Sequence, residues 1–431
     1  MREMWVARAA RLIAIAHRLS GSRPVRMWLA GILAALIVAG CSTGATSSPS
    51  VAATAGPTGT ASPTATPSEV LSASKSPTAT LAPLTFVATG SLQTARDGAT
   101  ATLLADGKIL VAGGEVDMTA LDVDYFVSAE LYDPATGRFT QTGSMSAARS
   151  GAIAIRLADG RVLIAGGDGC DTGRACTDVP ARNAIASAEI YDPATGKFTR
   201  TGPMGEALRD RPAVLLRDGR VFVASYAKHG DLYDPSTGKF NVTNKETSSS
   251  GAGTATLLPN GKVLVTGASL SQAELFDPSS AKYSSVSIAL SAGTPIAQFD
   301  DQYISRATLL PDGRVLLFEN GYLETYDPAS GVCVFDGSVS GVKEWLDATA
   351  TLLANGSILF AGGVAVASAA QATNTNAAVV YDAADGSIRT GHMQATRVFH
   401  TATALSDDTV LIAGGYDADG NPLASAELFK P

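Results

Sequence analysis

The feature that most limits how this chain can fold is an internal repeat. Residues 129–145 read AELYDPATGRFTQTGSM, and residues 188–204 read AEIYDPATGKFTRTGPM. A repeat of this kind sets the same short unit beside itself several times, and neighbouring units share a core. We therefore expect one repetitive architecture in place of the two or three separate domains that 431 residues would otherwise suggest.

An Asp-Gly or Asn-Gly pair marks each repeat at intervals of about fifty residues. Such a pair between apolar runs predicts a two-residue β-hairpin, because both central positions need a positive φ. The pairs divide the chain into seven units, the last with a degenerate pair. They are Asp106-Gly107, Asp159-Gly160, Asp218-Gly219, Asn260-Gly261, Asp312-Gly313, Asn355-Gly356 and Asp407-Asp408.

Each unit is predicted to contain four strands. A strand rich in Ala and Thr (residues 99–104) precedes the first hairpin, and a continuous apolar strand such as KILVAGG follows it. The third strand is AELYDP, whose Asp-Pro-Ala-Thr-Gly exit predicts a tight turn into an outer strand, FTQTGSM. Charged residues make up only 17% of the chain, so long amphipathic helices are not expected.

The last unit lacks an outer strand, because the chain ends at AELFKP. Residues 86–92 (FVATGSL) match the missing strand in residue type. We predict that they pair beside Phe429 and close the ring, which removes the edge strand of an open array. Aromatic pairs seven residues apart, such as Tyr132 with Phe139, predict the contacts between units, and Cys333 at such a position is interpreted as a core residue.

The units resemble bacterial kelch repeats of the galactose oxidase central-domain type over residues 84–431. The double glycine of such repeats stands at Gly113-Gly114, Gly166-Gly167, Gly362-Gly363 and Gly414-Gly415. With the repeat, this resemblance predicts an all-β fold: a seven-bladed kelch-type β-propeller of four-stranded blades, closed by the N-terminal outer strand.

Residues 1–40 are predicted to be a lipoprotein signal peptide. An Arg-rich segment precedes the apolar run 27–40, which ends in Val38-Ala39-Gly40-Cys41. This ending resembles the lipobox of bacterial lipoproteins and implies lipidation of Cys41; the alternative is an uncleaved anchor. Residues 41–83 are predicted to be the lipidated Cys and a disordered Ser/Thr/Pro/Ala-rich tether. We therefore expect an extracytoplasmic, membrane-anchored protein.

The charge of the chain argues against nucleic acid as a partner. Without residues 1–40, which carry six Arg and one Glu, the net charge falls from −8 to −13. An acidic protein repels phosphate backbones. We expect a monomer whose partner is a glycan or a protein of the cell envelope.

Loops between the second and third strands share one face with the links between blades, and recognition is expected there. These loops are long in the first, second, sixth and seventh units and short in the others. The unevenness predicts a lateral binding groove on this face. The long loops are residues 115–128, 168–187, 364–377 and 416–425.

Four arginines and one tryptophan stand in the links, nine or ten residues before a turn pair. They are Arg96, Arg149, Arg209, Arg397 and Trp345. Near the mouth of a central channel, Arg could bind a carboxylate or sulfate and Trp could stack on a sugar ring. The structural alternative is that the arginines pair with acidic groups of neighbouring blades and hold the ring together.

Cys170 and Cys176 bracket a short segment of the second long loop. In an exported protein this spacing predicts a disulfide. A metal pair is the weaker alternative, because no His lies near either Cys in the sequence.

No catalytic set, cofactor site or metal site is identified. Galactose oxidase uses a copper site of two His and two Tyr, one of them cross-linked to Cys. Here His229, His392 and His400 stand in unrelated or merely adjacent positions. The favoured hypothesis is a non-catalytic recognition scaffold for a glycan or protein. The alternatives are a carbohydrate-active enzyme, similar in scaffold to the kelch sialic-acid epimerases, and a purely structural role in the envelope.

Overall fold

The computed structural model shows an all-β protein. It describes residues 83–431 except 118–121, 172–175, 181–182, 226–228, 246–251, 268–272, 287–288, 291–305, 320–321, 339–343 and 369–370. The predicted signal peptide, Cys41 and all of the predicted tether but its last residue lie outside the described residues. Within these ranges no helix has the length and hydropathy needed to span a bilayer.

The main strands form seven sheets in the described residues, one for each unit of the sequence. The first unit forms β2 (Thr100–Leu103), β3 (Ile109–Ala112), β6 (Ala129–Asp133) and β7 (Arg138–Gln141). The second forms β9 (Ile153–Arg156), β10 (Val162–Ala165), β13 (Ala188–Asp192) and β14 (Lys197–Thr201). The third forms β15 (Ala213–Leu215), β16 (Val221–Val223), β17 (His229–Asp234) and β18 (Lys239–Lys245).

The remaining units repeat this order. The fourth forms β19 (Ala252–Leu257), β20 (Val263–Gly267), β21 (Glu274–Asp277) and β22 (Lys282–Ser285). The fifth forms β24 (Arg306–Leu309), β25 (Val315–Glu319), β26 (Tyr322–Asp327) and β27 (Val332–Ser338), and β23 (Ala289–Leu290) pairs with β27 in parallel. The sixth forms β29 (Thr349–Leu352), β30 (Ser357–Ala361), β33 (Ala377–Asp382) and β34 (Ile388–His392). The seventh forms β35 (Thr401–Ala404), β36 (Val410–Ala413), β37 (Ala426–Lys430) and β1 (Thr85–Ala88).

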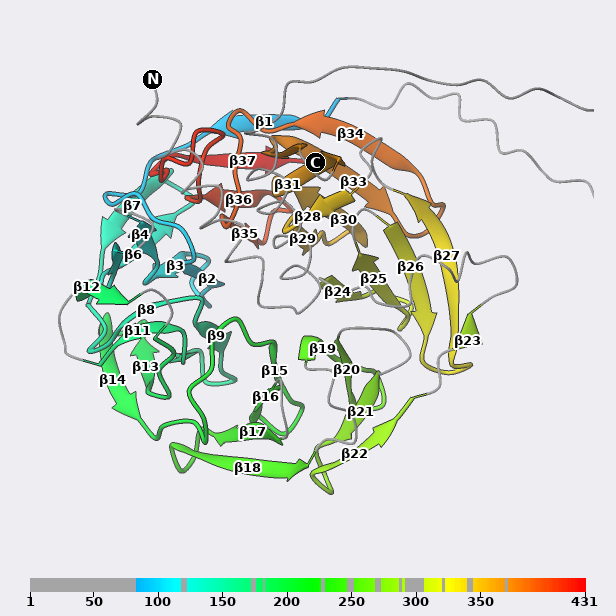
Figure 1. Ribbon diagram of the computed structural model, residues 1–431, viewed down its shortest axis with the longest axis horizontal. Helices are drawn as coiled ribbons and strands as arrows, with labels where there is room; N and C mark the ends of the chain where they lie inside the picture. The colour runs from blue at the N-terminus through cyan, green and yellow to red at the C-terminus, as the bar shows by residue number, and fades with distance from the viewer. Residues whose placement is uncertain are drawn as a thin grey trace, which may run out of the picture.

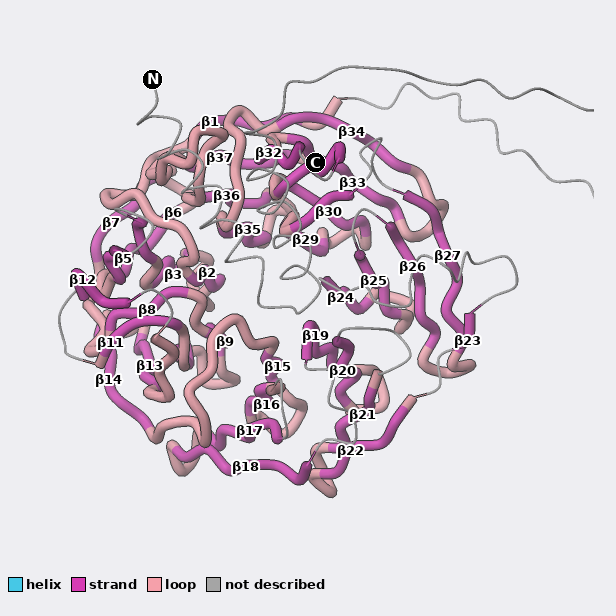
Figure 2. The backbone as a smooth tube through the Cα atoms, viewed as in Figure 1, coloured by secondary structure: helices cyan, strands magenta, loops and turns pink. Residues whose placement is uncertain are grey.

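The sheets are arranged around a common centre, with their first strands innermost (Figure 1). The innermost strands contact one another in the order β2, β9, β15, β19, β24, β29, β35 and back to β2. Figure 2 shows the same radial order, with loops connecting the strands. Small residues such as Ala101 and Ala154 suit these strands, because seven of them converge there.

The two ends of the chain meet in one sheet, as predicted. β1 pairs with β37 in antiparallel register, and Phe86 lies directly opposite Phe429. The two rings are 5.3 Å apart between centroids, and both side chains are buried. The N-terminal strand therefore supplies the outer strand that the seventh unit lacks.

The core lies between neighbouring sheets. Tyr132 and Phe139 face each other across β6 and β7, with ring centroids 4.9 Å apart, and pack against Leu411 of the seventh unit. Tyr191 and Phe198 repeat this contact between the second and first units. The predicted aromatic pairs are thus confirmed as contacts within a sheet that also fill the space between sheets. Cys333 is buried in the same kind of cluster.

The Thr142-Gly143 pair of the repeated segment joins adjacent sheets. Thr142 Oγ1 lies 2.9 Å from the hydroxyl oxygen of Tyr191, and the backbone N–H of Gly143 donates to the carbonyl of Gly196 at 3.0 Å. A Cβ atom on Gly143 would overlap that carbonyl oxygen. The same contacts recur through Thr89 and Gly90.

We expect Gly143→Ala to lower the free energy of unfolding by about 1–3 kcal/mol, because the backbone of the next sheet must move to admit the methyl group. Urea denaturation will measure the change. Thr140→Ala on the same strand is the control and should change it by no more than about 0.5 kcal/mol, since Thr140 is exposed. Equal stability of Gly143→Ala and the parent chain would contradict the role given to this contact.

Strand direction defines two faces. The Asp-Gly turns and the Asp-Pro-Ala-Thr-Gly turns lie at one end of the strands, named here the hairpin face. The links and the loops between second and third strands lie at the other end, named the link face. Thr85 pairs with Lys430, so the chain enters β1 and leaves β37 at the hairpin face.

Candidate functional site

Three of the four long loops of the link face carry strands of their own. In the first and second units, β4 (Glu115–Asp117), β5 (Asp122–Tyr125) and β12 (Cys176–Pro180) form one sheet, so that two loops are joined. β8 (Ala148–Ser150) pairs with β11 (Asp168–Cys170). In the sixth unit a second three-stranded sheet is formed by β28 (Glu344–Leu346), β31 (Val364–Ser368) and β32 (Gln371–Asn374). The long loops therefore build an added layer above the first, second and sixth sheets.

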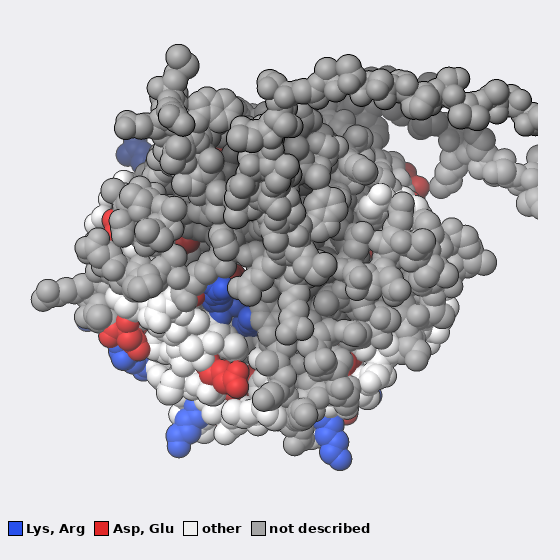
Figure 3. Space-filling model, viewed as in Figure 1, with Lys and Arg blue, Asp and Glu red and all other residues white. Residues whose placement is uncertain are grey.

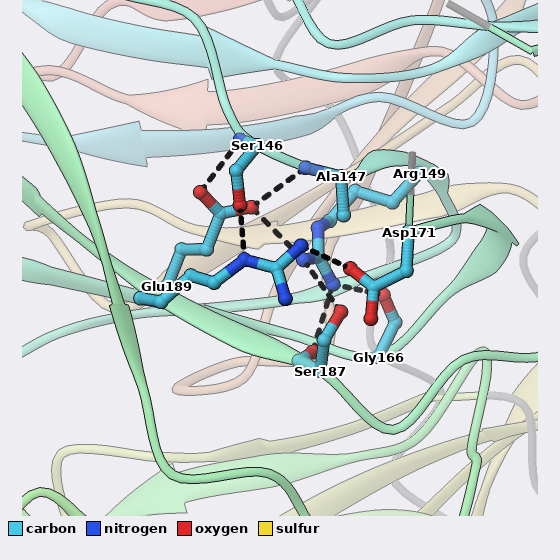
Figure 4. Close-up of polar contacts among 8 residues, drawn as sticks. Ser146, Ala147, Arg149, Gly166, Asp171, Ser187 and Glu189 are labelled. Carbon is cyan, nitrogen blue, oxygen red and sulfur yellow. Dashed lines mark hydrogen bonds and ion pairs between the residues drawn. The ribbon is translucent and has the colours of Figure 1, made fainter. Parts of the chain in front are cut away.

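In three of the links an arginine is buried at the centre of a polar cluster, called here the clamp. Arg149 Nη1 donates to the carbonyls of Gly166 and Ser187 at 2.8 and 2.9 Å. Its Nη2 donates to Ser187 Oγ and to Glu189 Oε1 at 3.1 and 3.0 Å (Figure 4). Glu189 in turn accepts the backbone N–H groups of Ser146 and Ala147. The clamp thus joins a link to the third strand of the sheet that follows it.

Arg96 and Arg397 form the same clamp in the first and seventh units. Arg96 binds Gly113, Ser128 and Glu130, with 3.0 Å between Nη2 and Glu130 Oε1. Arg397 binds Gly414, Ser425 and Glu427, with 3.0 Å between Nε and Glu427 Oε1.

The clamp explains the double glycine. The carbonyl of Arg149 accepts the backbone N–H of Gly114 in the preceding unit at 2.9 Å. A Cβ atom on Gly113 would overlap that same carbonyl oxygen. Gly362-Gly363 make the equivalent contacts with the carbonyl of Arg397. Each of these arginines therefore contacts the preceding sheet through its backbone carbonyl and the following sheet through its side chain.

The interpretation of Arg96, Arg149 and Arg397 as ligand-binding groups at a channel mouth is corrected by this geometry. Each side chain is about 1% exposed, and its guanidinium is already occupied by protein acceptors. Burial lowers the pKa of each guanidinium, against the charge of the carboxylate it faces. These three residues instead fit the alternative in which the arginines pair with acidic groups and hold the ring together.

The interpretation of Trp345 as a residue that stacks on a sugar ring is corrected in the same way. It is 1% exposed, and its indole N–H donates to the carbonyl of Gly362 at 2.6 Å, the acceptor that Arg uses in the other clamps. In this unit Ala377 and Val379 stand where the Ser and Glu of the clamp would be. The sixth unit thus replaces a polar clamp with an apolar one.

Arg209 differs from the other candidates because it stands one residue further along its link. Leu208 takes the clamp position, and its carbonyl accepts the backbone N–H of Gly167 at 2.7 Å. The Arg209 side chain is 28% exposed and forms an ion pair with Asp168 at 2.6 Å. Burial lowers the pKa of Arg209, but the hydrogen bond to Asp168 and the charges of Asp168 and Asp210 act together against it, and the pKa is raised. Of the predicted binding residues, only Arg209 reaches solvent.

The loss of the clamp arginine leaves a buried carboxylate in the third unit. Asp231 stands at the position of Glu189 and is 4% exposed. It accepts the backbone N–H of Gly205 at 3.2 Å. Burial raises the pKa of Asp231 above its usual value.

The link residues that follow the clamp form an arc of backbone on the link face, beside the innermost strands. Gly98 N–H donates to the carbonyl of Phe399 at 3.2 Å, and Gly151 N–H donates to the carbonyl of Gly98 at 2.8 Å. Asp210 N–H then donates to the carbonyl of Gly151 at 2.9 Å. These four residues, Phe399, Gly98, Gly151 and Asp210, are called here the arc. Sequence analysis did not identify it, although each member stands two residues after a clamp position.

Charged side chains lie beside the arc. The link between β14 and β15 carries Arg209, Asp210 and Arg211, and Asp168 approaches it from β11. Figure 3 shows basic side chains near the middle of the viewed face, between β9 and β15, with acidic side chains near them. This is the part of the predicted site that presents polar groups to solvent.

Cys170 is disulfide-bonded in the structure. The side chain of Cys176 lies outside the described residues, so its pairing with Cys170 stays a prediction. Cys333 is a free, buried thiol, and burial followed by the charge of Glu324 raises its pKa.

The described histidines do not gather into a ligand set. His229 is on β17, His392 is on β34, and His400 directly precedes β35. Among the residues that the structure describes, no group of three or more His, Cys, Asp and Glu side chains is placed to hold a metal ion.

Comparison with known proteins bears on the fold. No family model matches the chain, and no curated protein matches its sequence. A fungal alcohol oxidase of the AA5 family in complex with copper is similar in structure, with a TM-score of 0.58 at 16% identity over 80% of this chain and 76% of that chain. The fold is of the propeller type. Streptogramin B lyase is also similar, with a TM-score of 0.54 at 12% identity over 80% of this chain and 98% of that chain.

Proposed function

We propose that the chain is a lipid-anchored, extracytoplasmic kelch-type propeller of seven blades, and that it acts as a non-catalytic recognition scaffold. In this proposal Cys41 carries the lipid, residues 41–83 form the tether, and the blades bind a glycan or protein of the cell envelope on the link face.

The added strands of the link face are the observation that carries this proposal. Strand β12 of the second unit pairs with β5 of the first, so two loops form one continuous sheet above the blades. The third, fourth and fifth units have short loops. A rigid scaffold with loops raised on one side is the arrangement that recognition surfaces use.

A carbohydrate-active enzyme is the second candidate. Its support is the exposed part of the site, where Arg209 and Asp168 form an ion pair beside Asp210. Charged side chains of both signs in one place could serve a proton transfer as well as binding. Release of product from a bound sugar would favour this candidate over a scaffold.

The test is a binding screen with residues 41–431 carrying Cys41→Ser, which removes the lipidation site and keeps the rest. The protein is probed with a glycan array and used to capture envelope proteins. Reproducible binding that saturates supports a scaffold, and absence of binding to every glycan and protein argues for the structural role. Labelling of the full chain with a radioactive fatty acid, lost on Cys41→Ser, tests the anchor separately.

A further inference from the structure

Three polar contacts join the first and second units. Thr142 Oγ1 lies 2.9 Å from the hydroxyl oxygen of Tyr191. The backbone N–H of Gly114 donates to the carbonyl of Arg149, and the side chain of Arg149 pairs with Glu189. Among the described residues, none of these three contacts has a counterpart between the fourth and fifth units.

The hydroxyl contact is lost through a single substitution. Val286 makes the backbone bond of Thr142, since its N–H donates to the carbonyl of Ala273 at 2.9 Å, but it has no hydroxyl group. Tyr326 stands opposite the start of β25 as Tyr191 stands opposite the start of β10. Its hydroxyl therefore faces a valine where Tyr191 faces a threonine.

The glycine contact is lost because the second strand continues past the point where it turns in the other units. Gly267 stands at the position of Gly113, but it lies in β20, pairs with Ala252 and does not have a positive φ. In the sequence Gln302 stands ten residues before its turn pair, where Arg149 stands before its own. Gln302 lies outside the described residues.

Glu324 stands at the position of Glu189 and is left buried. It is 4% exposed, and its Oε1 has no hydrogen-bond partner. Its Oε2 accepts the thiol of Cys333 at 3.5 Å, and a thiol is a weak donor. Burial, followed by the charge of Asp336, raises the pKa of Glu324. A buried carboxyl group without its partners weakens the contact that it lies in.

Apolar packing and one short strand pair hold this junction. Cys333 takes the place of Phe198 in the cluster that fills the space between the sheets, and β23 pairs with β27 over two residues. Each of the other junctions keeps a hydroxyl contact or a clamp in the described residues. These contacts are Arg96–Glu130, Arg149–Glu189, Thr201–Tyr233, Thr243–Tyr283, Trp345–Gly362 and Arg397–Glu427.

We propose that the junction between the fourth and fifth units is a seam at which the ring opens locally while the other sheets stay folded. Opening there separates apolar surfaces and the β23–β27 pair, gives water to Glu324 and exposes the thiol of Cys333. The added layer of the link face stands on the first, second and sixth units, so the seam opens without moving it. This property is separate from the proposed recognition function.

Cys333 reports the opening directly. Its thiol is free and 1% exposed, and burial raises its pKa, so a maleimide reacts with it only after the seam has opened. The experiment uses residues 41–431 with Cys41→Ser at neutral pH, and peptide mapping locates the label. We expect labelling at least about tenfold faster than global unfolding permits, at a rate that low urea does not change, because local opening exposes little surface.

Two variants should close the seam by different contacts. Glu324→Met fills the same space with an unbranched apolar side chain and removes the buried carboxyl group. Val286→Thr offers the hydroxyl of Tyr326 the partner that Tyr191 has. Each should slow the labelling of Cys333 by about tenfold.

Thr142→Val is the matched control, because it makes the opposite exchange at the junction between the first and second units. It should lower the urea midpoint of the whole protein and leave the labelling rate of Cys333 in low urea unchanged.

Two results would overturn the inference. Labelling that follows global unfolding, with the urea dependence of the whole protein, would show that the ring has no seam at Cys333. A rate independent of urea that either variant fails to slow would place the opening elsewhere. Neither result bears on recognition, which the binding screen tests.

Discussion

Replacement of Arg149 by Ala is expected to lower the free energy of unfolding by about 3–5 kcal/mol, because it leaves the carboxylate of Glu189 buried without its cation. The Arg149 side chain is 0% exposed and that of Glu189 is 1% exposed, so water cannot replace the lost partner. The carbonyls of Gly166 and Ser187 lose a donor at the same time. Urea denaturation at constant pH will measure the change.

The sixth unit suggests a variant that should restore the stability lost in Arg149→Ala. The variant Arg149→Trp, Ser187→Ala, Glu189→Val copies the set that the chain itself uses at Trp345, and it should recover most of the lost stability. Arg161→Ala is the control for loss of an arginine, because the Arg161–Asp159 pair is exposed and such pairs contribute about 0–1 kcal/mol. If Arg149→Ala costs no more than Arg161→Ala, the clamp does not hold the sheets together.

Acidification from pH 7 to pH 4 is expected to destabilise the protein by about 3 kcal/mol through His400 alone. Burial, followed by the charges of Arg397 and Arg306, lowers the pKa of His400 to about 3. An unfolded chain protonates the same ring at about 6.5. Because the folded-state pKa is depressed, the stabilising contribution is complete above about pH 6.5 and is lost as the pH falls toward 3.

The variant His400→Gln should flatten this part of the stability–pH curve, since Gln keeps a polar group near Thr349 and does not titrate. His400 Nε2 lies 3.2 Å from Thr349 Oγ1 in the structure. His392→Gln is the control, because His392 is exposed on β34 and should leave the curve unchanged. Urea midpoints measured from pH 4 to pH 7 will show the difference. Parallel curves for the parent chain and His400→Gln would contradict the prediction.

Local sequence signals were sufficient to predict the strands of each sheet and their order. The Asp-Gly pairs do form hairpins, but the predicted two-residue turn with a positive φ at both central positions is wrong. Gly107 has a φ of 84°, whereas Asp106 does not have a positive φ. The Leu104 N–H donates to the carbonyl of Lys108, so the loop has three residues, with glycine at its left-handed position. The pairing of Phe86 with Phe429 could be predicted because the missing outer strand has a distinct composition that reappears at the other end of the chain.

The roles of the link arginines could not be settled from their spacing alone. A residue ten places before a turn can point into a channel or into the space between sheets, and the choice depends on acceptors distant in sequence. A signal was nevertheless present. Arg149 occurs with a Ser-Ala-Glu at the start of the third strand, and Trp345 occurs where that Ser and Glu are replaced by Ala377 and Val379. Comparison of these positions between units would have favoured the clamp.

The arc was beyond sequence reasoning for a physical reason. In the sequence, Gly98 and Gly151 resemble ordinary turn glycines. The sequence contains no pattern that marks Asp210 or Phe399 as sharing their backbone conformation. Only the hydrogen bonds between successive links place the four residues in one line.

The pairing of Thr85 with Lys430 puts both ends of the propeller at the hairpin face. An extension added after Pro431 therefore leaves from the same side as the predicted tether. Attached to a bead or sensor chip through such an extension, the protein would be held from its hairpin face, with the link face and the arc turned outward. An assay built in that way would reproduce the orientation expected for the proposed lipid-anchored protein.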